Sequence, residues 1–357
     1  MHYPPPIHGA AMVGQYIINS ESINTEFDTQ YINLSTSKNV DEIGKTGILK
    51  WVRYSKIILS TIKCLWFFRP NLVYITLTAK EIGFYKDALL VFLAKLHGKK
   101  VVIHFHNKGV RSRQDFKFDD FLYKCVFKNS KVILLAPELY QDVEKYVHRE
   151  QVYYCSNGIP EINVEIQASE KVASEVTLLF LSNLIISKGI LVLLEACKVL
   201  KQRNIVFHCN VVGGSGDLSE QDLESKIKML KLESQVSYLG KKYGNEKNEV
   251  FANASIFVLP TFYENECFPL VLLEAMQFSL PIVSTNEGGI PSIIDSGKVG
   301  CLVTKKDVLS LADTLEFLIN DSEIRVQMGK AAKMKFKDNY TLAIFEDNFK
   351  SILYQIL

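Results

Sequence analysis

Short apolar runs rich in Val, Ile and Tyr alternate with helical segments along the chain, and this alternation constrains the fold more than any other feature. In the first half, the expected strands are 29–35, 72–78, 100–106, 131–137 and 151–157. The expected helices between them are 48–68, 82–97, 116–128 and 138–147. Alternation on this scale predicts βαβ units and a parallel sheet that is covered on both faces.

The same rhythm restarts after a polar stretch, 160–174, which we interpret as a linker. The expected strands are 176–182, 205–212, 236–240, 256–260, 281–285 and 301–303. The expected helices are 190–202, 219–232, 270–278 and 308–319, with more toward the C-terminus. The sequence therefore predicts a second doubly wound domain. We place the domains at residues 1–165 and 166–339 and expect a C-terminal helix, 340–357, to join the first.

The loop 4–12, which contains Gly9, should follow a first strand, as a strand–loop–helix unit requires. Only three residues precede it. We therefore expect that strand to be missing from this sequence, or the loop to open the chain unsupported.

Composition excludes several classes of protein. With 48% hydrophobic residues and a net charge of +2, the chain of 357 residues is not disordered as a whole. No uninterrupted apolar run approaches the ~18 residues of a membrane-spanning helix, and we find no signal peptide. The 7 cysteines form no CxxC pair, which favours reduced core cysteines in a cytosolic protein over a zinc site or disulfides.

The charge is unevenly distributed along the chain. Residues 1–160 contain 21 Lys and Arg against 14 Asp and Glu, whereas the remainder contains 20 against 25. A basic first half favours a phosphorylated partner or an anionic membrane surface. An uneven distribution of solvated charge explains the same counts.

The strongest chemical signal is the segment 260–276, PTFYENECFPLVLLEAM, which runs from the end of an expected strand into an expected helix. The N–H groups at a helix start, together with the helix dipole, form an anion site suited to a diphosphate. We assign this site to Phe268, Pro269, Leu270 and Val271. Glu266, in the loop, is then placed to accept hydrogen bonds from sugar hydroxyls, and Glu274, about two turns into the helix, from a ribose. The flanking sequence is too apolar for a solvated helix face.

These two glutamates, with the stretch 281–291 (PIVSTNEGGIP) that follows them, resemble the donor site of family 4 retaining glycosyltransferases. The resemblance covers nearly the whole chain and is most specific in the second half. It implies the GT-B fold, an α/β architecture of two facing Rossmann-like domains with the active site in the cleft between them. Within the family, enzymes of bacterial capsule, O-antigen lipopolysaccharide and exopolysaccharide assembly are the most similar.

Two further stretches of the second half agree with this resemblance. The stretch 181–189 (LSNLIISKG) is similar to the family's segment whose Arg and Lys grip the donor diphosphate. Lys188 is retained, but Asn183 stands where the Arg is usual and brings no charge. Gly214 follows an expected strand in VVGGSGD, whose family counterpart lies beside the nucleotide; a tight turn alone explains these glycines equally well.

In the first half, the resemblance implies two more site residues. His106 ends a strand, at a position where the family has a His that contacts the donor sugar or its phosphate. Strand alternation points His104 to the same side, so the choice of His106 rests on the resemblance. Gly9 resembles part of a Gly-Gly loop that covers the donor phosphate, and Ala10 replaces the second Gly.

The segment 50–69 combines Lys50, Arg53, Lys56 and Lys63 with Trp and Ile, and its basic residues recur at helical spacing. A basic amphipathic helix can lie on an anionic bilayer. The alternative is a helix that covers the sheet and keeps solvated lysines on its outer face.

We therefore expect a retaining, hexosyltransferase-type enzyme that moves a sugar from a nucleotide-diphosphate donor to a glycan or a polyprenyl-diphosphate-linked glycan. The expected catalytic residues are Glu266, His106 and Lys188. We expect a UDP- or GDP-linked sugar as co-substrate, no metal, no other cofactor and no nucleic acid partner. The expected location is the cytoplasm, with peripheral contact at the inner face of the plasma membrane. A nucleotide-sugar epimerase of similar fold and a non-catalytic scaffold of a glycan assembly complex are the alternatives.

Overall fold

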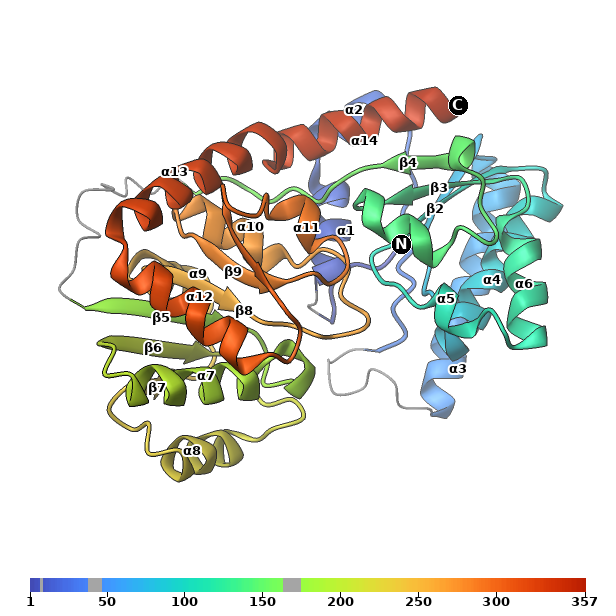
Figure 1. The fold of residues 1–357 in the computed structure, drawn as a ribbon. Helices are drawn as coiled ribbons and strands as arrows, with labels where there is room; N and C mark the ends of the chain where they lie inside the picture. Colours follow the sequence, from blue (N-terminus) through green and yellow to red (C-terminus); the bar gives the residue numbers. More distant parts are fainter. Residues whose placement is uncertain (7–8, 38–46, 163–174) are drawn as a thin grey trace. The chain divides into compact units, whose positions relative to one another are not determined.

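The computed structural model describes residues 1–6, 9–37, 47–162 and 175–357. Its internal contacts divide the chain into two compact units (Figure 1). Unit 1 comprises Met1–Gly158 and Leu342–Leu357, and unit 2 comprises Ile159–Thr341. Most of the expected linker lies outside the described residues. Where it is described, the N–H of Ile162 donates to Oε1 of Gln277 over 2.8 Å, which ties the start of the linker to unit 2.

Unit 2 is built on a parallel sheet with the order β10-β9-β8-β5-β6-β7. Its strands are β5 (Val176–Leu181), β6 (Phe207–Val212), β7 (Val236–Tyr238), β8 (Ile256–Leu259), β9 (Ile282–Thr285) and β10 (Gly300–Val303). The strands after β5 extend the sheet to one side, and those from β8 onward extend it to the other. The strand order therefore reverses between β5 and β8, as in a doubly wound sheet, and the strands expected in the second half are confirmed.

Helices cover this sheet on both faces (Figure 1). They are α7 (Ile190–Gln202), α8 (Glu220–Met229), α9 (Gly244–Ala252), α10 (Leu270–Gln277), α11 (Ile290–Ile293), α12 (Val308–Asn320) and α13 (Ser322–Asn339). Helix α7 packs against α12, and α10 packs against α13. Every residue of β8 and β9 is buried, which explains the unbroken apolar sequence of β8. The two buried hydroxyl groups of β9, on Ser284 and Thr285, donate to the carbonyls of Leu259 and Thr261.

Unit 1 contains a parallel sheet with the order β1-β2-β3-β4. Its strands are β1 (Leu72–Thr76), β2 (Lys100–His104), β3 (Ser130–Leu134) and β4 (Val152–Tyr154). Its helices are α1 (Gly9–Asn19), α2 (Glu21–Glu26), α3 (Ile48–Lys63) with its π-helical continuation η2 (Cys64–Phe68), α4 (Glu81–Leu96), α5 (Val110–Arg113), α6 (Lys117–Phe127) and α14 (Leu342–Ile356). Strand β1 lies at the edge of this sheet.

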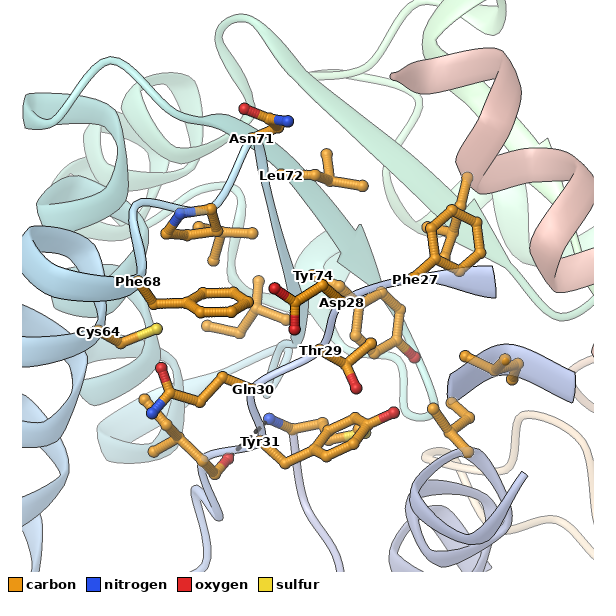
Figure 2. A pocket seen from close by; sticks show the side chains of 18 of the residues that line it. Phe27, Asp28, Thr29, Gln30, Tyr31, Cys64, Phe68, Asn71, Leu72 and Tyr74 are labelled. Carbon is orange, nitrogen blue, oxygen red and sulfur yellow. Dashed lines mark hydrogen bonds between the residues drawn. The ribbon is translucent and has the colours of Figure 1, made fainter. Parts of the chain in front are cut away.

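Two expectations for unit 1 are wrong. Residues 29–35 form no strand. Among the described residues, their backbone–backbone hydrogen bonds join them to Met1 alone, and a single residue cannot build a ladder. Together with residues 72–75 of β1, residues 29–32 line a cavity of about 460 Å³ (Figure 2).

Residues 138–147 form no α-helix. A short 3₁₀ segment, Pro137–Asp142, lies there instead. The carboxylate of Asp142 accepts from the N–H groups of Gly109, Val110 and Arg111, which holds this turn against the start of α5.

Candidate functional site

The site in unit 2 lies at the reversal of strand order, where the loops after β5 and β8 meet. Lys188 ends a 3₁₀ turn (Ile186–Lys188) that follows β5, and Glu266 lies in the loop that follows β8. The Lys188 ammonium Nζ is 2.5 Å from Oε2 of Glu266. Glu266 is only 6% exposed, and the Lys188 ammonium lies beside its carboxylate where little water reaches. The fold therefore brings together two of the three residues expected to be catalytic.

Neighbouring groups hold this ion pair in place. The Thr261 hydroxyl lies 3.5 Å from Oε2 of Glu266 and 3.3 Å from the carbonyl oxygen of Ser187, so it connects the two loops. The Lys188 ammonium also lies 4.9 Å from the centre of the Tyr263 ring, a cation–π arrangement. The backbone N–H of Glu266 donates to the Tyr263 carbonyl over 2.8 Å, which closes the turn that presents the carboxylate.

Two glycines allow the loops around the ion pair to touch through their backbones. Gly189 has a φ of 91°, and a Cβ there would lie 2.2 Å from the carbonyl oxygen of Pro260. Gly288, in the loop after β9, has a φ of 54°, and a Cβ there would lie 2.2 Å from the carbonyl oxygen of Glu266. Only glycine fits at either position. The loops after β5, β8 and β9 therefore form one closely packed layer around the ion pair.

The start of α10 supplies the N–H groups expected to bind an anion. Pro269 is the N-cap residue and has no N–H. The Leu272 N–H already donates to the Pro269 carbonyl over 3.1 Å. Among the described residues, no hydrogen bond uses the N–H groups of Leu270 and Val271. Phe268 is buried, and its ring packs edge-on against Tyr340, which anchors this side chain at the helix start.

The second glutamate of the motif has a lysine partner that the sequence analysis missed. Oε1 of Glu274 accepts from Nζ of Lys247, on α9, over 2.8 Å. A third pair joins Oε2 of buried Glu287 to Lys305 over 2.6 Å. Lys247 and Lys305 carry no motif that distinguishes them from other polar residues, so only the tertiary structure identifies them.

The remaining residues expected in unit 2 lie at the ends of β5 and β6. Asn183 follows β5 and is exposed. The carbonyl of Gly214 accepts from the Leu184 N–H over 2.8 Å, and a Cβ at Gly214 would meet the Lys241 side chain. The carbonyl of neighbouring Gly213 accepts from the Tyr238 hydroxyl over 2.8 Å. Burial and a hydrogen bond to Glu220 raise the pKa of Tyr238 to about 12, so this phenol remains a donor.

The residues expected in unit 1 lie in two places. His104 and His106 are on the same side of the chain, with ring centres 4.2 Å apart, as strand alternation predicts. His104 is fully buried, and its Nδ1 is 2.8 Å from the Tyr74 hydroxyl. Burial lowers the pKa of His104 well below its usual value. His106 is half-buried as a residue, but both of its ring nitrogens are buried. Gly9 is the exposed first residue of α1, and part of its loop lies outside the described residues.

All seven cysteines are free thiols, four of them buried. Within the described part of the chain, no group of three or more His, Cys, Asp or Glu side chains could hold a metal ion. The expectation that no metal takes part in the reaction remains a prediction.

The geometry at the end of the unit 2 sheet fits a phosphorylated ligand. One lysine and two unused helix N–H groups can neutralise and bind phosphate oxygens. Glu266 and Glu274 are acceptors for hydroxyl groups. A ligand that carries both phosphate and hydroxyl groups matches this combination.

Comparison with known proteins identifies relatives of this chain. Residues 161–335 match the family model described as glycosyl transferases group 1. The putative colanic acid biosynthesis glycosyltransferase WcaL of Escherichia coli is 26% identical over 268 residues, which cover 73% of this chain and 65% of WcaL. The amylovoran biosynthesis glycosyltransferase AmsK of Erwinia amylovora is 27% identical over 270 residues, 74% of this chain and 66% of AmsK. The matched part of the chain thus spans less than two thirds of the length of these relatives.

Solved structures show the same fold at lower sequence identity. Anabaena HepE in complex with UDP-glucose matches with a TM-score of 0.69 and 17% identity, over 99% of this chain and 98% of HepE. The lipopolysaccharide outer core galactosyltransferase WaaB matches with a TM-score of 0.73 and 15% identity, over 100% of this chain and 98% of WaaB. The chain therefore has the fold of the GT-B glycosyltransferases. With the family match to unit 2, this establishes that residues 161–335 belong to the family of glycosyl transferases group 1.

Proposed function

We propose that this protein is a retaining glycosyltransferase of surface polysaccharide biosynthesis. It would transfer a sugar, of hexose type, from a nucleotide-diphosphate donor to a glycan or a lipid-linked glycan. Two relatives named for colanic acid and amylovoran biosynthesis support the pathway class. Solved structures of HepE with UDP and UDP-glucose support a nucleotide-sugar donor.

The Lys188–Glu266 pair at the reversal of strand order is the observation that carries this proposal. In doubly wound sheets, ligands bind at the carboxyl ends of the strands at this point. Lys188 and the first N–H groups of α10 would bind the diphosphate and stabilise the charge that develops on it as the sugar leaves.

Glu266 would orient the donor sugar. Its Oε2 atom is engaged by Lys188 and Thr261, whereas in the described residues no hydrogen bond uses Oε1. Oε1 is therefore the oxygen proposed to accept from a sugar hydroxyl. Glu274 would hold the ribose, and its bond to Lys247 would fix the direction of its carboxylate. The roles proposed for His106, Asn183, Gly214 and Gly9 rest on the family resemblance, and no metal or further cofactor is proposed.

The first test is a thermal-shift measurement with UDP, GDP, ADP, NAD and buffer alone. A ligand at about 100 times its dissociation constant adds roughly 2.7 kcal/mol of stability. We expect a clear shift with one sugar-donor nucleotide and none with NAD. A folded sample that responds to none of them would contradict the donor site and favour the non-catalytic scaffold.

The second test follows the nucleotide product with the donor sugar identified in this way. Transfer to an acceptor or to water releases free nucleoside diphosphate, whereas an epimerase makes a new nucleotide sugar without releasing it. Retention is read from the anomeric configuration of the product by NMR. Formation of an epimer with no release of nucleotide would overturn the transferase assignment.

We further propose that α3 and η2 of unit 1 contact an anionic membrane surface. Their outer face carries Leu49, Val52, Lys56, Leu59, Lys63 and Phe67, spaced by three or four residues and all exposed. Phe67 is 80% exposed and Leu59 is 65% exposed. The opposite face is buried through Tyr54, Ile57 and Leu65. Exposed aromatic and aliphatic side chains among lysines are typical of helices that lie in a membrane interface.

Arg53 does not belong to this basic face, although the sequence placed it there. Its guanidinium donates to the carbonyl of Thr36 over 2.7 Å, and the residue is half-buried.

Among the described residues, every helix is too short or too polar to span a bilayer.

A further inference from the structure

A second buried glutamate, Glu287, borders the site in unit 2, and the proposed reaction gives it no role. Glu287 lies in the loop after β9 and is only 6% exposed. Its Oε2 atom accepts from Nζ of Lys305, in the loop after β10, over 2.6 Å. The Lys305 side chain is 41% exposed, so water reaches the cation but hardly reaches the carboxylate. Burial of a carboxylate costs free energy that an ion pair only partly returns, so the fold gains little stability from this pair.

The other carboxylate oxygen of Glu287 holds the backbone of its own loop. The N–H of Gly288 donates to Oε1 of Glu287 over 3.2 Å. Gly288 has a φ of 54°, in the left-handed region, and this hydrogen bond helps to fix it there. The Glu287 carboxylate therefore connects the backbone at Gly288 to the cation of a neighbouring loop.

The backbone that Glu287 holds is in contact with the loop that carries Glu266. The N–H of Gly289 donates to the Cys267 carbonyl over 2.6 Å. A Cβ at Gly288 would lie 2.2 Å from the Glu266 carbonyl oxygen, so the two backbones touch there. Closely packed segments transmit displacements to each other. A shift of residues 287–289 would therefore displace Glu266 and the start of α10.

The next residue after Lys305 contacts another loop around the site. Nζ of Lys306 lies 4.7 Å from the centre of the Phe262 ring, in the loop after β8. The N–H of Phe262 donates to the Ser187 carbonyl over 2.7 Å, next to Lys188. Lys306 has a φ of 61°, which is uncommon for residues other than glycine. The loop after β10 therefore contacts the loops after both β8 and β9, and these two loops support the ion pair of the site.

We propose that Glu287 and Lys305 are positioning residues for Glu266. Their ion pair fixes the loop after β9, and that loop fixes the backbone from which the Glu266 carboxylate meets the donor sugar. This role rests on the proposed function, in which Glu266 orients the sugar. A group that acts on a substrate has to be held within roughly 0.5 Å of its productive position, and the residues packed around it provide that precision.

The test is a kinetic double-mutant cycle on the full chain. Glu287→Gln keeps the size of the side chain and an acceptor for the Gly288 N–H, but it removes the ionic bond to Lys305. We expect E287Q to lower kcat about tenfold and to leave the Kd for the nucleotide within about twofold, because Glu266 acts on the sugar. In the E266Q background, E287Q should lower kcat no further, because the residue through which it acts is already lost.

Three further variants control this cycle. Lys305→Arg keeps the charge and can form the same ion pair, so it should retain most of the activity. Lys305→Met should lower kcat as E287Q does. Glu316→Gln breaks another ion pair of unit 2, in which Glu316 accepts from Arg203 over 2.6 Å, just after the end of α7. We expect E316Q to leave kcat unchanged.

Two kinetic results would overturn the positioning role. An unchanged kcat in E287Q would show that the pair serves only the fold of unit 2. A further tenfold loss of kcat on adding E287Q to E266Q would show that Glu287 acts independently of Glu266.

Hydrogen exchange separates this role from the proposed function. A wild-type protein that releases no nucleoside diphosphate from any donor would contradict the transferase assignment, and the Gly289 amide then decides the structural part. Faster exchange of this amide in E287Q, but not in E316Q, would confirm that the pair fixes the backbone beside Glu266. Equal exchange in the wild type and E287Q would overturn the positioning role whether or not the protein transfers a sugar.

Discussion

The side chains of Lys188 and Glu266 are 2.5 Å apart, although 78 residues separate them in the sequence. Each would otherwise be a charge with little access to water, since their side chains are 16% and 8% exposed. Without a ligand, the lysine proposed to bind a phosphate is therefore paired with the carboxylate proposed to bind a sugar. A donor that binds both groups would give each of them a partner of its own.

Replacing Glu266 by Gln tests the sugar-facing role. The amide keeps the size of the side chain but loses the charge that would align a sugar hydroxyl. We expect kcat to fall about 100-fold, on the scale of one lost transition-state contact, while the Kd for the nucleotide remains within about threefold. Steady-state kinetics and calorimetry measure the two effects. Glu264→Gln is the matched control, because Glu264 lies exposed on the same loop. Unchanged transfer kinetics in E266Q would remove Glu266 from the reaction.

A double-mutant cycle tests the ion pair itself. Lys188→Met leaves the Glu266 carboxylate buried without its partner, which we expect to lower the free energy of unfolding by on the order of 2 kcal/mol. Adding E266Q to this variant should recover much of that loss, because no unpaired charge then remains. Urea unfolding of the wild type, the two single variants and the double variant gives the coupling energy. Additive losses would mean that the pair contributes no coupling.

The ribose role of Glu274 predicts a selective loss of affinity. We expect Glu274→Gln to weaken UDP, or the nucleotide that binds, about tenfold, while the affinity for inorganic diphosphate stays the same. The reason is that the substitution affects an acceptor for ribose hydroxyls but leaves Lys188 and the start of α10 intact. Calorimetric titration with both ligands checks this. Equal losses for both ligands would indicate that the Glu274–Lys247 pair is structural.

Asp87 makes the stability of unit 1 depend on pH. Burial raises the pKa of its carboxyl to about 6, although the carboxylate accepts from the Thr78 N–H over 2.8 Å. The pKa of Asp87 in the folded state lies above its value in the unfolded chain. The contribution of Asp87 to the free energy of unfolding is therefore fully present below pH ~4 and is lost as the pH rises through about 6. At pH 8, we expect the free energy of unfolding of D87N to exceed that of the wild type by on the order of 2 kcal/mol. Near pH 4, we expect the two proteins to unfold at similar urea concentrations. Asp115→Asn, at an exposed carboxylate, should show no such crossover.

Charge reversal tests the proposed membrane face. Lys56→Glu with Lys63→Glu removes two exposed cations from the face that carries Leu59 and Phe67. At about 1 kcal/mol for each lysine at an anionic surface, we expect binding to vesicles with 30% phosphatidylglycerol to weaken at least ~30-fold. Lys228→Glu with Lys330→Glu, on unit 2, is the control of equal charge. Similar binding by both double variants would locate the contact elsewhere or show it to be non-specific.

The sequence predicts most elements of the fold because their patterns are local. Unbroken apolar runs such as 256–259 have to be buried on both faces, and helices such as Ile190–Gln202 show their period directly. Residues 138–147 have a helical composition, but the long-range bonds of Asp142 decide their conformation. Helix α9 was missed because its polar sequence has only one buried residue, Phe251.

The candidate site was predictable in its residues but not in its contacts. The motifs identify Lys188, Glu266 and Glu274 one by one, since each lies at a recognisable position after a strand or in a helix. That Lys188 pairs with Glu266 depends on which strands are neighbours in the sheet, and one sequence does not contain that information. Lys247 is identified as part of the site only by its hydrogen bond to Glu274 in the structure.

The close approach of Gly189 to the Pro260 carbonyl, and that of Gly288 to the Glu266 carbonyl, limit how this protein can be redesigned. In a library that randomises the loops at the end of the unit 2 sheet, variants with another residue at either glycine would fail to fold, since only glycine fits there. Diversity is better placed at exposed Asn183, Glu264 and Asn286, on the same three loops. A change of donor preference can then be selected without rebuilding the backbone that holds the charged pair.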